Sequence, residues 1–114
     1  MDLKTTLGSF IGTTKYYRSG FGTLHLTEGI HYLRETANCY WLIDIVESYQ
    51  PMLTDVPFQI WTLKVNEDES ALVTCKEDSD QPCLVKQEIE YTDFPLDEIE
   101  FYCIDGVVLL KSEY

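Results

Sequence analysis

Three sets of side chains in this sequence have types and spacings that could support chemistry. His31 and Glu35 are four residues apart, so they would share one face of a helix and could form half of a metal site. Asp44 lies inside the apolar run LIDIV, where burial would adapt a carboxylate to acid–base work. A cysteine beside His25 or His31 could act as a nucleophile. Each set also has a structural explanation.

The surrounding sequence favours the structural explanation in each case. No second ligand motif such as H-E-x-x-H accompanies His31, and no two cysteines have the C-x-x-C spacing of a zinc site. The cysteines lie in patterns that predict burial, and Asp44 could occupy an exposed helix stripe or pair with Arg34 or Lys15. The sequence also lacks G-x-S-x-G and a glycine-rich phosphate-binding loop. We therefore assign no catalytic residue, no metal ligand and no cofactor.

Acidic residues without nearby bases form a second pattern. Residues 90–106, EYTDFPLDEIEFYCIDG, contain six carboxylates and no basic residue. Strand periodicity turns the acids of residues 88–90 and of residues 98–100 away from the core, and they would form one cluster if their strands are neighbours. Like charges that face each other across a sheet are destabilising, which favours a functional role such as binding a basic partner. The predicted partner-binding acids are Glu88, Glu90, Asp97, Glu98 and Glu100.

Two interpretations of this acidic surface are open. It could imitate nucleic-acid phosphates and occupy the binding groove of a DNA- or RNA-handling protein. It could instead be a solvated face that protects an edge strand from aggregation. The formal net charge is −12, and residues 41–114 hold seventeen acids against four bases. This balance argues against direct binding to nucleic acid or to an anionic membrane, and it favours a basic protein partner.

The loop TTKYYR, followed by Phe21, is a second candidate contact. Tyr16, Tyr17 and Arg18 lie between glycines, and tyrosine and arginine are residue types that often anchor interfaces. Alternatively, one of the two tyrosines could pack into the core. The sequence supports both interpretations equally.

These residues must be positioned by a helical first half and a strand-rich second half. Residues 2–10 predict a short helix, and Thr27 predicts the start of another, whose apolar positions recur at a spacing of three or four. Asn38 is a plausible cap for a largely buried helix that Pro51 ends. From residue 57 onward the apolar period changes to two, which is typical of strands.

The strand patterns predict an antiparallel meander of about five strands. Asp105-Gly106 is a strong two-residue hairpin signal near its end. We expect an α+β fold in which two or three N-terminal helices pack on this meander, as one domain over residues 1–114. No leader-like N-terminus and no apolar run of about 20 residues is visible, so we expect a cytoplasmic protein with reduced thiols. Cys75 and Cys83 flank a predicted turn and could lie close together.

Several segments together resemble a known family. The segments YWLIDI, FQIW, TDFPLDEI and IDGVVLLKSEY carry the resemblance most specifically, and it spans most of the chain. They are similar to a family of small uncharacterised bacterial proteins, a domain of unknown function often carried by plasmids and phages. The family brings no activity and no catalytic residue. The mobile-element setting that it implies is one where small acidic proteins are often inhibitors of host defence, including anti-CRISPR proteins.

The leading hypothesis is a non-enzymatic binding protein. It would block a nucleic-acid-handling protein, such as a CRISPR effector, through its acidic sheet, with Tyr16, Tyr17 and Arg18 as a second contact. One alternative is a structural or assembly module, such as a homodimer, whose charge maintains solubility. Another is a small hydrolase or metal-dependent enzyme that uses Asp44 or His31.

Overall fold

Three α-helices, two short 3-10 helices and seven strands are present in the described part of the chain. The structure, a computed structural model, describes residues 2–114. Its helices are α1 (Leu3–Gly8), α2 (Glu28–Thr36) and α3 (Tyr40–Tyr49), with short 3-10 helices η1 (Gln50–Met52) and η2 (Lys111–Glu113). Its strands are β1 (Tyr17–Arg18), β2 (His25–Leu26), β3 (Phe58–Val65), β4 (Ala71–Lys76), β5 (Cys83–Ile89), β6 (Glu98–Ile104) and β7 (Val107–Leu110).

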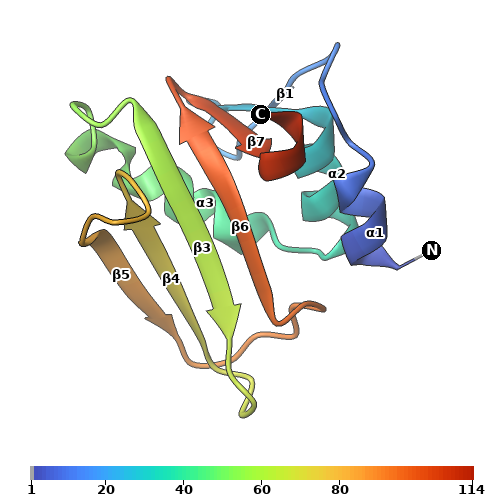
Figure 1. The fold of residues 1–114 in the computed structure, drawn as a ribbon, viewed down its shortest axis with the longest axis vertical. Coiled ribbons are helices and arrows are strands. Elements are labelled where there is room, and N and C mark those ends of the chain that lie inside the picture. Colours follow the sequence, from blue (N-terminus) through green and yellow to red (C-terminus); the bar gives the residue numbers. More distant parts are fainter. Residues whose placement is uncertain (1) are drawn as a thin grey trace.

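All seven strands form one mixed sheet with the order β1-β2-β7-β6-β3-β4-β5 (Figure 1). Neighbours are antiparallel except β2 and β7, which are parallel. The predicted five-strand meander is therefore wrong. β6 pairs with β3 rather than β5, and the first half of the chain adds two short strands to the sheet. The fold is sheet-rich, and helices and strands are not separated into two halves.

The connection between β5 and β6 explains the strand order. Residues 90–97 are longer than a tight hairpin loop, and they carry the chain past the ends of β4 and β3 before β6 begins (Figure 1). This places β3 in the sheet interior, where both of its edges are hydrogen-bonded. The hairpin between β6 and β7 is confirmed, since Asp105 and Gly106 have φ of 50° and 82°, the positive values that a type I′ turn requires.

Local capping sets the helix boundaries. The predicted start of α2 is confirmed, because the Ile30 amide donates to Thr27 Oγ1 at 3.3 Å. The prediction that Asn38 caps the next helix is wrong. Asn38 has a φ of 51°, and the Cys39 amide donates to the Arg34 carbonyl at 3.1 Å. This left-handed geometry ends α2, and Asn tolerates it better than most residues.

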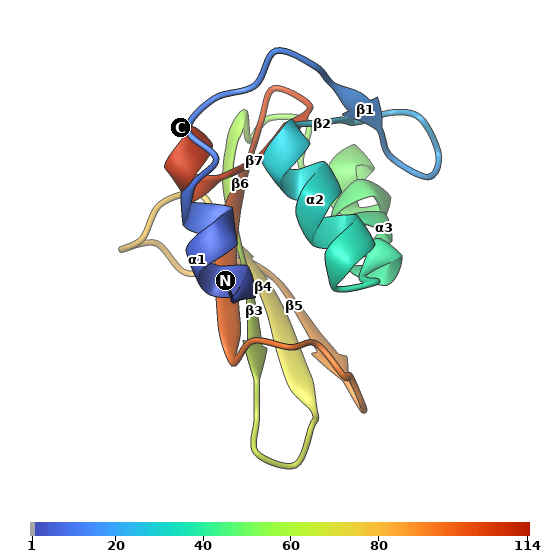
Figure 2. The same ribbon diagram turned by 90° about the vertical axis from the view of Figure 1, so that its right-hand side faces the viewer.

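Helices α2 and α3 lie on the same side of the sheet (Figure 2). Their apolar stripes supply buried residues such as Leu33 and Leu42, which belong to the same core cluster as Trp61 and Phe101 of the sheet. Burying a large apolar side chain contributes roughly 1.5–3 kcal/mol. The expectation that one sheet face packs against the helices is therefore confirmed.

The opposite face of β3, β4, β5 and β6 is open, and its outward side chains are half-buried or exposed. Phe58, Tyr102 and Tyr114 form an aromatic cluster there, with ring centroids 5.1–5.6 Å apart. Within residues 2–114, no helix has the length and apolar character needed to cross a membrane.

Candidate functional site

The predicted cluster of strand acids does not form. Two strands, β4 and β3, lie between β5 and β6, so the acids of the two strands are separated across the sheet. One cross-strand row illustrates the arrangement: Glu98 of β6 lies opposite Lys64, Lys64 lies opposite Leu72, and Leu72 lies opposite Glu88 of β5. The acids therefore alternate with apolar and basic residues on the open face.

The outward acid at the centre of β6 is also neutralised. Glu100 forms a 3.1 Å ion pair with Lys111 and accepts a 3.3 Å hydrogen bond from Thr62 Oγ1. The hydrogen bond to Glu100 raises the pKa of Lys111, so this lysine stays charged at neutral pH. The open face of the sheet thus lacks the single carboxylate cluster that neighbouring β5 and β6 would have formed.

Carboxylates gather instead at one end of the sheet. The β3–β4 turn, residues 66–70, and the β5–β6 connection, residues 90–97, meet there (Figure 1). Two backbone hydrogen bonds join them, from the Val65 amide to the Asp97 carbonyl at 2.7 Å and from the Thr92 amide to the Glu69 carbonyl at 2.8 Å. We call residues 64–70 and 88–98 the acidic end. Its acids are Glu67, Asp68, Glu69, Glu88, Glu90, Asp93, Asp97 and Glu98.

The turn in the acidic end is internally braced. Asp68 accepts hydrogen bonds from the Ser70 hydroxyl at 2.5 Å and the Ser70 amide at 3.0 Å, which lower the pKa of Asp68. Asn66 donates to the Ser70 hydroxyl at 3.0 Å, and Glu69 adopts a positive φ of 69°. Asp68 therefore stabilises the turn, whereas the neighbouring Glu67 is exposed to solvent.

The β5–β6 connection in the acidic end is anchored in the hydrophobic core. The side chain of Phe94 is buried in the core, and its amide donates to the hydroxyl of buried Thr92 at 3.1 Å. The residues between and around these anchors are exposed, including Tyr91, Asp93 and Asp97. Exposed charges thus sit on a backbone that core packing holds in place.

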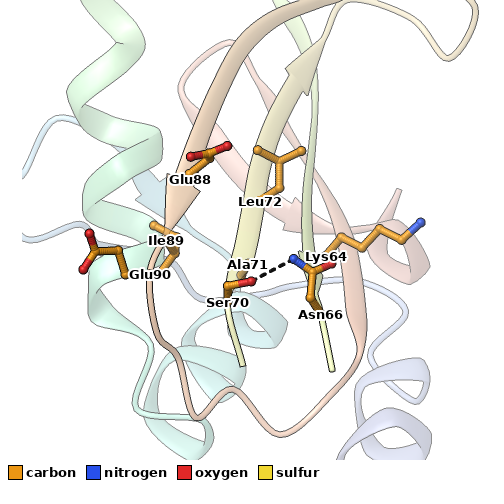
Figure 3. Close-up of a pocket in the computed structure, with 8 residues that line it drawn as sticks. All are labelled: Lys64, Asn66, Ser70, Ala71, Leu72, Glu88, Ile89 and Glu90. Atoms are coloured by element: carbon orange, nitrogen blue, oxygen red, sulfur yellow. Dashed lines mark hydrogen bonds between the residues drawn. The ribbon is translucent and has the colours of Figure 1, made fainter. Parts of the chain in front are cut away.

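A hollow of about 500 Å³ opens in the acidic end (Figure 3). Leu72 and Glu88, which lie opposite each other on the open face, line it together with Glu90, while Ala71 and Ile89 belong to the face that points toward the helices. The remaining lining residues are Lys64, Asn66 and Ser70, and Figure 3 shows the Asn66–Ser70 hydrogen bond that holds the turn beside it. An apolar surface next to carboxylates suits the alkyl stem and cationic head of a lysine or arginine side chain.

The tyrosine–arginine loop does not share this site. Its strand, β1, lies at the opposite edge of the sheet from β5. Tyr17 is half-buried and stacks on His31 with ring centroids 3.6 Å apart, whereas Tyr16 and Arg18 are exposed. Arg18 donates to the Gly22 carbonyl at 3.1 Å, which braces the loop itself.

The residues considered above for metal binding or acid–base catalysis make structural contacts instead. His31 stacks on Tyr17, while Glu35 accepts a hydrogen bond from the Tyr40 hydroxyl, so the two residues have separate contacts. Asp44 is half-buried beside Gly20 rather than paired with a base; the ion pair within residues 2–114 is that of Lys111 with Glu100. No three His, Cys, Asp or Glu side chains in this described part of the chain are grouped so that they could hold a metal ion.

All four cysteines are free thiols, including Cys75 and Cys83. Burial raises the pKa of Cys39, Cys75 and Cys103 to about 12. These three thiols therefore remain protonated at neutral pH and have little nucleophilic character.

Sequence reasoning missed Glu47, which is only 5% exposed on α3. Its carboxylate accepts hydrogen bonds from the Phe21 amide at 3.0 Å, the Thr23 amide at 2.9 Å, and the hydroxyls of Ser19 and Thr23. Burial acts to raise the pKa of Glu47, but the hydrogen bonds outweigh it and hold the pKa below the ordinary value. The available signal was its position four residues after Ile43, on the buried helix stripe.

Comparison with known proteins identifies the chain at the level of its family. No curated protein and no solved structure matches it. A family model does match, over residues 1–114. The chain therefore belongs to the family of unknown function DUF6876.

Proposed function

We propose that this protein is a non-enzymatic inhibitor whose acidic end occupies a basic, nucleic-acid-binding surface of a partner protein. The observation that carries the proposal is the junction of two acid-rich segments, residues 66–70 and 90–97, through backbone hydrogen bonds. An anti-defence role, for instance against a CRISPR effector in the cytoplasm, fits this chemistry and the carriage on plasmids or phages that the sequence resemblance implies.

The charge distribution supports this function. The acidic end contains eight carboxylates and one base, Lys64, so its net charge of −7 is more than half of the −12 of the chain. At physiological salt, charges act over a Debye length of about 8 Å, so neighbouring carboxylates on one frame attract a basic surface together. A fixed frame also reduces the ordering cost of binding.

The hollow supports a specific rather than a diffuse contact. Glu88 and Glu90 line it together with Leu72, which lies opposite Glu88 on the open face. A lysine or arginine that inserts there would place its alkyl stem on apolar surface and its charge against carboxylates. Such residues are the ones that a nucleic-acid-binding groove directs at phosphates.

Charge reversal tests the proposal. The variant Glu67→Lys/Asp93→Lys/Asp97→Lys changes exposed residues of the acidic end whose side chains make no hydrogen bond described in the structure. The control Asp55→Lys/Glu77→Lys/Asp80→Lys makes the same charge change at exposed positions outside the acidic end. Three exposed contacts at about 0.5–1 kcal/mol each predict that the first variant loses roughly tenfold or more in affinity.

The readout has two stages. Host proteins captured at low salt are identified by mass spectrometry, and each purified candidate is then assayed for binding to an oligonucleotide in the presence of this protein. We expect the wild type and the control to displace the oligonucleotide, and the acidic-end variant to fail. Equal displacement by both variants, or capture that is indifferent to salt, would reject the acidic end as the binding surface.

A structural or assembly role is the second candidate, and the free edge of β5 favours it. We propose no catalytic role, because the buried thiols are protonated and Asp44 and His31 have separate structural contacts.

A further inference from the structure

Strand β5 ends the sheet, and on its outer side it pairs with no other strand of the described chain. Alternate residues of such an edge strand direct their N–H and C=O groups outward, where another strand can pair with them. A groove of about 370 Å³ runs beside this edge, lined by Trp41, Ile45, Ile89, Tyr91, Thr92 and Asp93. We propose that β5 pairs antiparallel with β5 of a second copy of this chain, around a two-fold axis at Gln87.

The side chains of β5 select this register. Lys86 and Glu88 point to the open face, while Val85 and Ile89 point toward the helices. Residues opposite each other in an antiparallel pair must lie on the same face, so a two-fold axis has to pass through a residue rather than between two. The three central choices are Lys86, Gln87 and Glu88.

Charge distinguishes the three registers. An axis at Lys86 places this lysine against its own copy, and an axis at Glu88 places two glutamates together. An axis at Gln87 places Lys86 of each copy opposite Glu88 of the other. Opposite charges across a strand pair are stabilising and like charges are destabilising. The Gln87 register is the one in which both charged pairs are complementary.

The inner face of the same register is apolar. The axis at Gln87 brings Val85 of each copy opposite Ile89 of the other. Ile89 also lines the groove beside α3, together with half-buried Trp41 and Ile45. Pairing would therefore cover apolar surface on the helix side while it satisfies backbone groups at the edge.

An alternative is that β5 is an edge strand protected against pairing. Charged residues are one feature of protected edges, and a β-bulge is another; the bulge here lies where β5 meets Cys75 and Lys76. The bulge lies at one end of the strand and leaves residues 85–89 in regular register with β4. Protection requires only that charge be present. The alternation of lysine and glutamate around Gln87 adds self-complementarity, which protection does not require.

A charge swap tests the proposal by sedimentation velocity over a concentration series. We expect the wild type to dimerise, and we expect Lys86→Glu and Glu88→Lys each to shift the equilibrium toward monomer by at least tenfold. The double variant Lys86→Glu/Glu88→Lys restores both complementary pairs and should restore the dimer. Both side chains are exposed, and circular dichroism checks that each variant is folded.

Three outcomes would overturn the proposal: a wild type that is monomeric throughout, a dimer that the single variants leave unchanged, or a double variant that fails to recover the dimer. A monomer would overturn it even if β5 binds a strand of another protein. Asp93 lines the groove beside β5, so the reduced variant Glu67→Lys/Asp97→Lys, which leaves both β5 and this groove untouched, serves for the comparison and should dimerise normally while it still weakens inhibition. Failure of the inhibitory function and failure of self-association are thereby distinguishable.

Cross-linking tests the register independently, in a Cys83→Ser background that removes the half-exposed thiol of β5. The axis places the two copies of residue 87 directly opposite each other, about 4.5–5.5 Å apart at Cα, within disulfide range. Gln87→Cys should therefore cross-link on oxidation. Leu84→Cys is the control, since its two copies would be roughly 20 Å apart. Absence of a cross-link at 87, or equal cross-linking at both positions, would overturn the register.

Discussion

At the scale of single residues, the carboxylate of Glu47 lies between helix α3 and the loop of residues 19–23. It accepts hydrogen bonds from Ser19, Phe21 and Thr23, and it does so while almost fully buried. A buried carboxylate is tolerated because these donors replace the water that it has lost. The loop consequently has a fixed shape and holds Phe21, which is 75% exposed, in solvent.

We predict that Glu47→Gln destabilises the protein by about 2–3 kcal/mol, because hydrogen bonds to charged groups contribute roughly 1.5–3 kcal/mol and the amide presents a donor where an acceptor is needed. Urea unfolding measures the loss. The matched control is Asp44→Asn, nearly one turn earlier on α3, which should change the free energy of unfolding by less than about 0.5 kcal/mol. Equal losses would contradict a specific role for Glu47.

The stabilisation that the Glu47 carboxylate provides should depend on pH. The pKa of Glu47 in the folded protein lies below its ordinary value of 4.5, so the unfolded chain takes up a proton first as the pH falls. The stabilisation by this carboxylate is therefore fully present above about pH 5 and is lost as the pH falls through its folded pKa. The difference in stability between wild type and Glu47→Gln should shrink over this acidic window. A constant difference from pH 7 to pH 3 would contradict the assignment.

Sequence periodicity could place this residue on the buried stripe of α3, but it could not identify the donors that satisfy it. The pattern of α3 indicates a nearly continuous apolar surface, but the donors to Glu47 come from a loop more than twenty residues earlier. Whether an acid on such a helix is exposed or satisfied inside depends on that long-range packing. Asp44 drew attention because it lies in the apolar run LIDIV, but its side chain lies beside Gly20.

At the scale of elements, boundaries that depend on neighbouring residues were predictable. Thr27 begins α2, and Asp105 and Gly106 form the hairpin between β6 and β7, because each signal acts within a few residues. Strand order depends on which distant strand covers each edge. The pattern of β5 and β6 is equally compatible with direct pairing, and the connection of residues 90–97 decides otherwise.

We predict that Gly106→Ala destabilises the sheet by about 1–2 kcal/mol, because Gly106 has a φ of 82° and an L side chain there clashes with its own backbone. The turn also matters beyond its hairpin, since the Gly106 carbonyl accepts from the His25 amide at 2.9 Å. Thermal unfolding compares this variant with Gly12→Ala, where an added Cβ meets no atom within 4 Å. A similar melting temperature for both variants would contradict the turn assignment.

At the scale of the whole molecule, the net charge of the chain was predictable but its location was not. The sequence places the acids in the second half, and an adjacent β5 and β6 would have spread them over the open face. The observed order instead distributes Lys64, Lys86 and Lys111 among the strand acids of that face. The acidic end keeps eight carboxylates and one base, Lys64.

A self-associated form would present two such ends. The proposed axis at Gln87 runs through the sheet between antiparallel strands, so it turns the acidic ends of the two copies in opposite directions. Two separated acidic ends on one continuous sheet would allow bivalent binding to a partner with repeated basic sites, with an effective concentration set by a rigid spacer.

Crowded like charges should also limit stability. The variant Glu67→Lys/Asp93→Lys/Asp97→Lys lowers the net charge from −12 to −6 and removes repulsion within the acidic end. We predict that the melting temperature of this variant at low salt exceeds that of the wild type. Added sodium chloride should raise the melting temperature of the wild type more than that of the variant, because salt shortens the Debye length from about 30 Å at 0.01 M to about 8 Å at 0.15 M. Thermal unfolding across this range measures both effects. The same salt should weaken partner binding, so stability and affinity should change in opposite directions as salt is added. If the stability of the wild type instead falls with salt, attraction rather than repulsion dominates the acidic end.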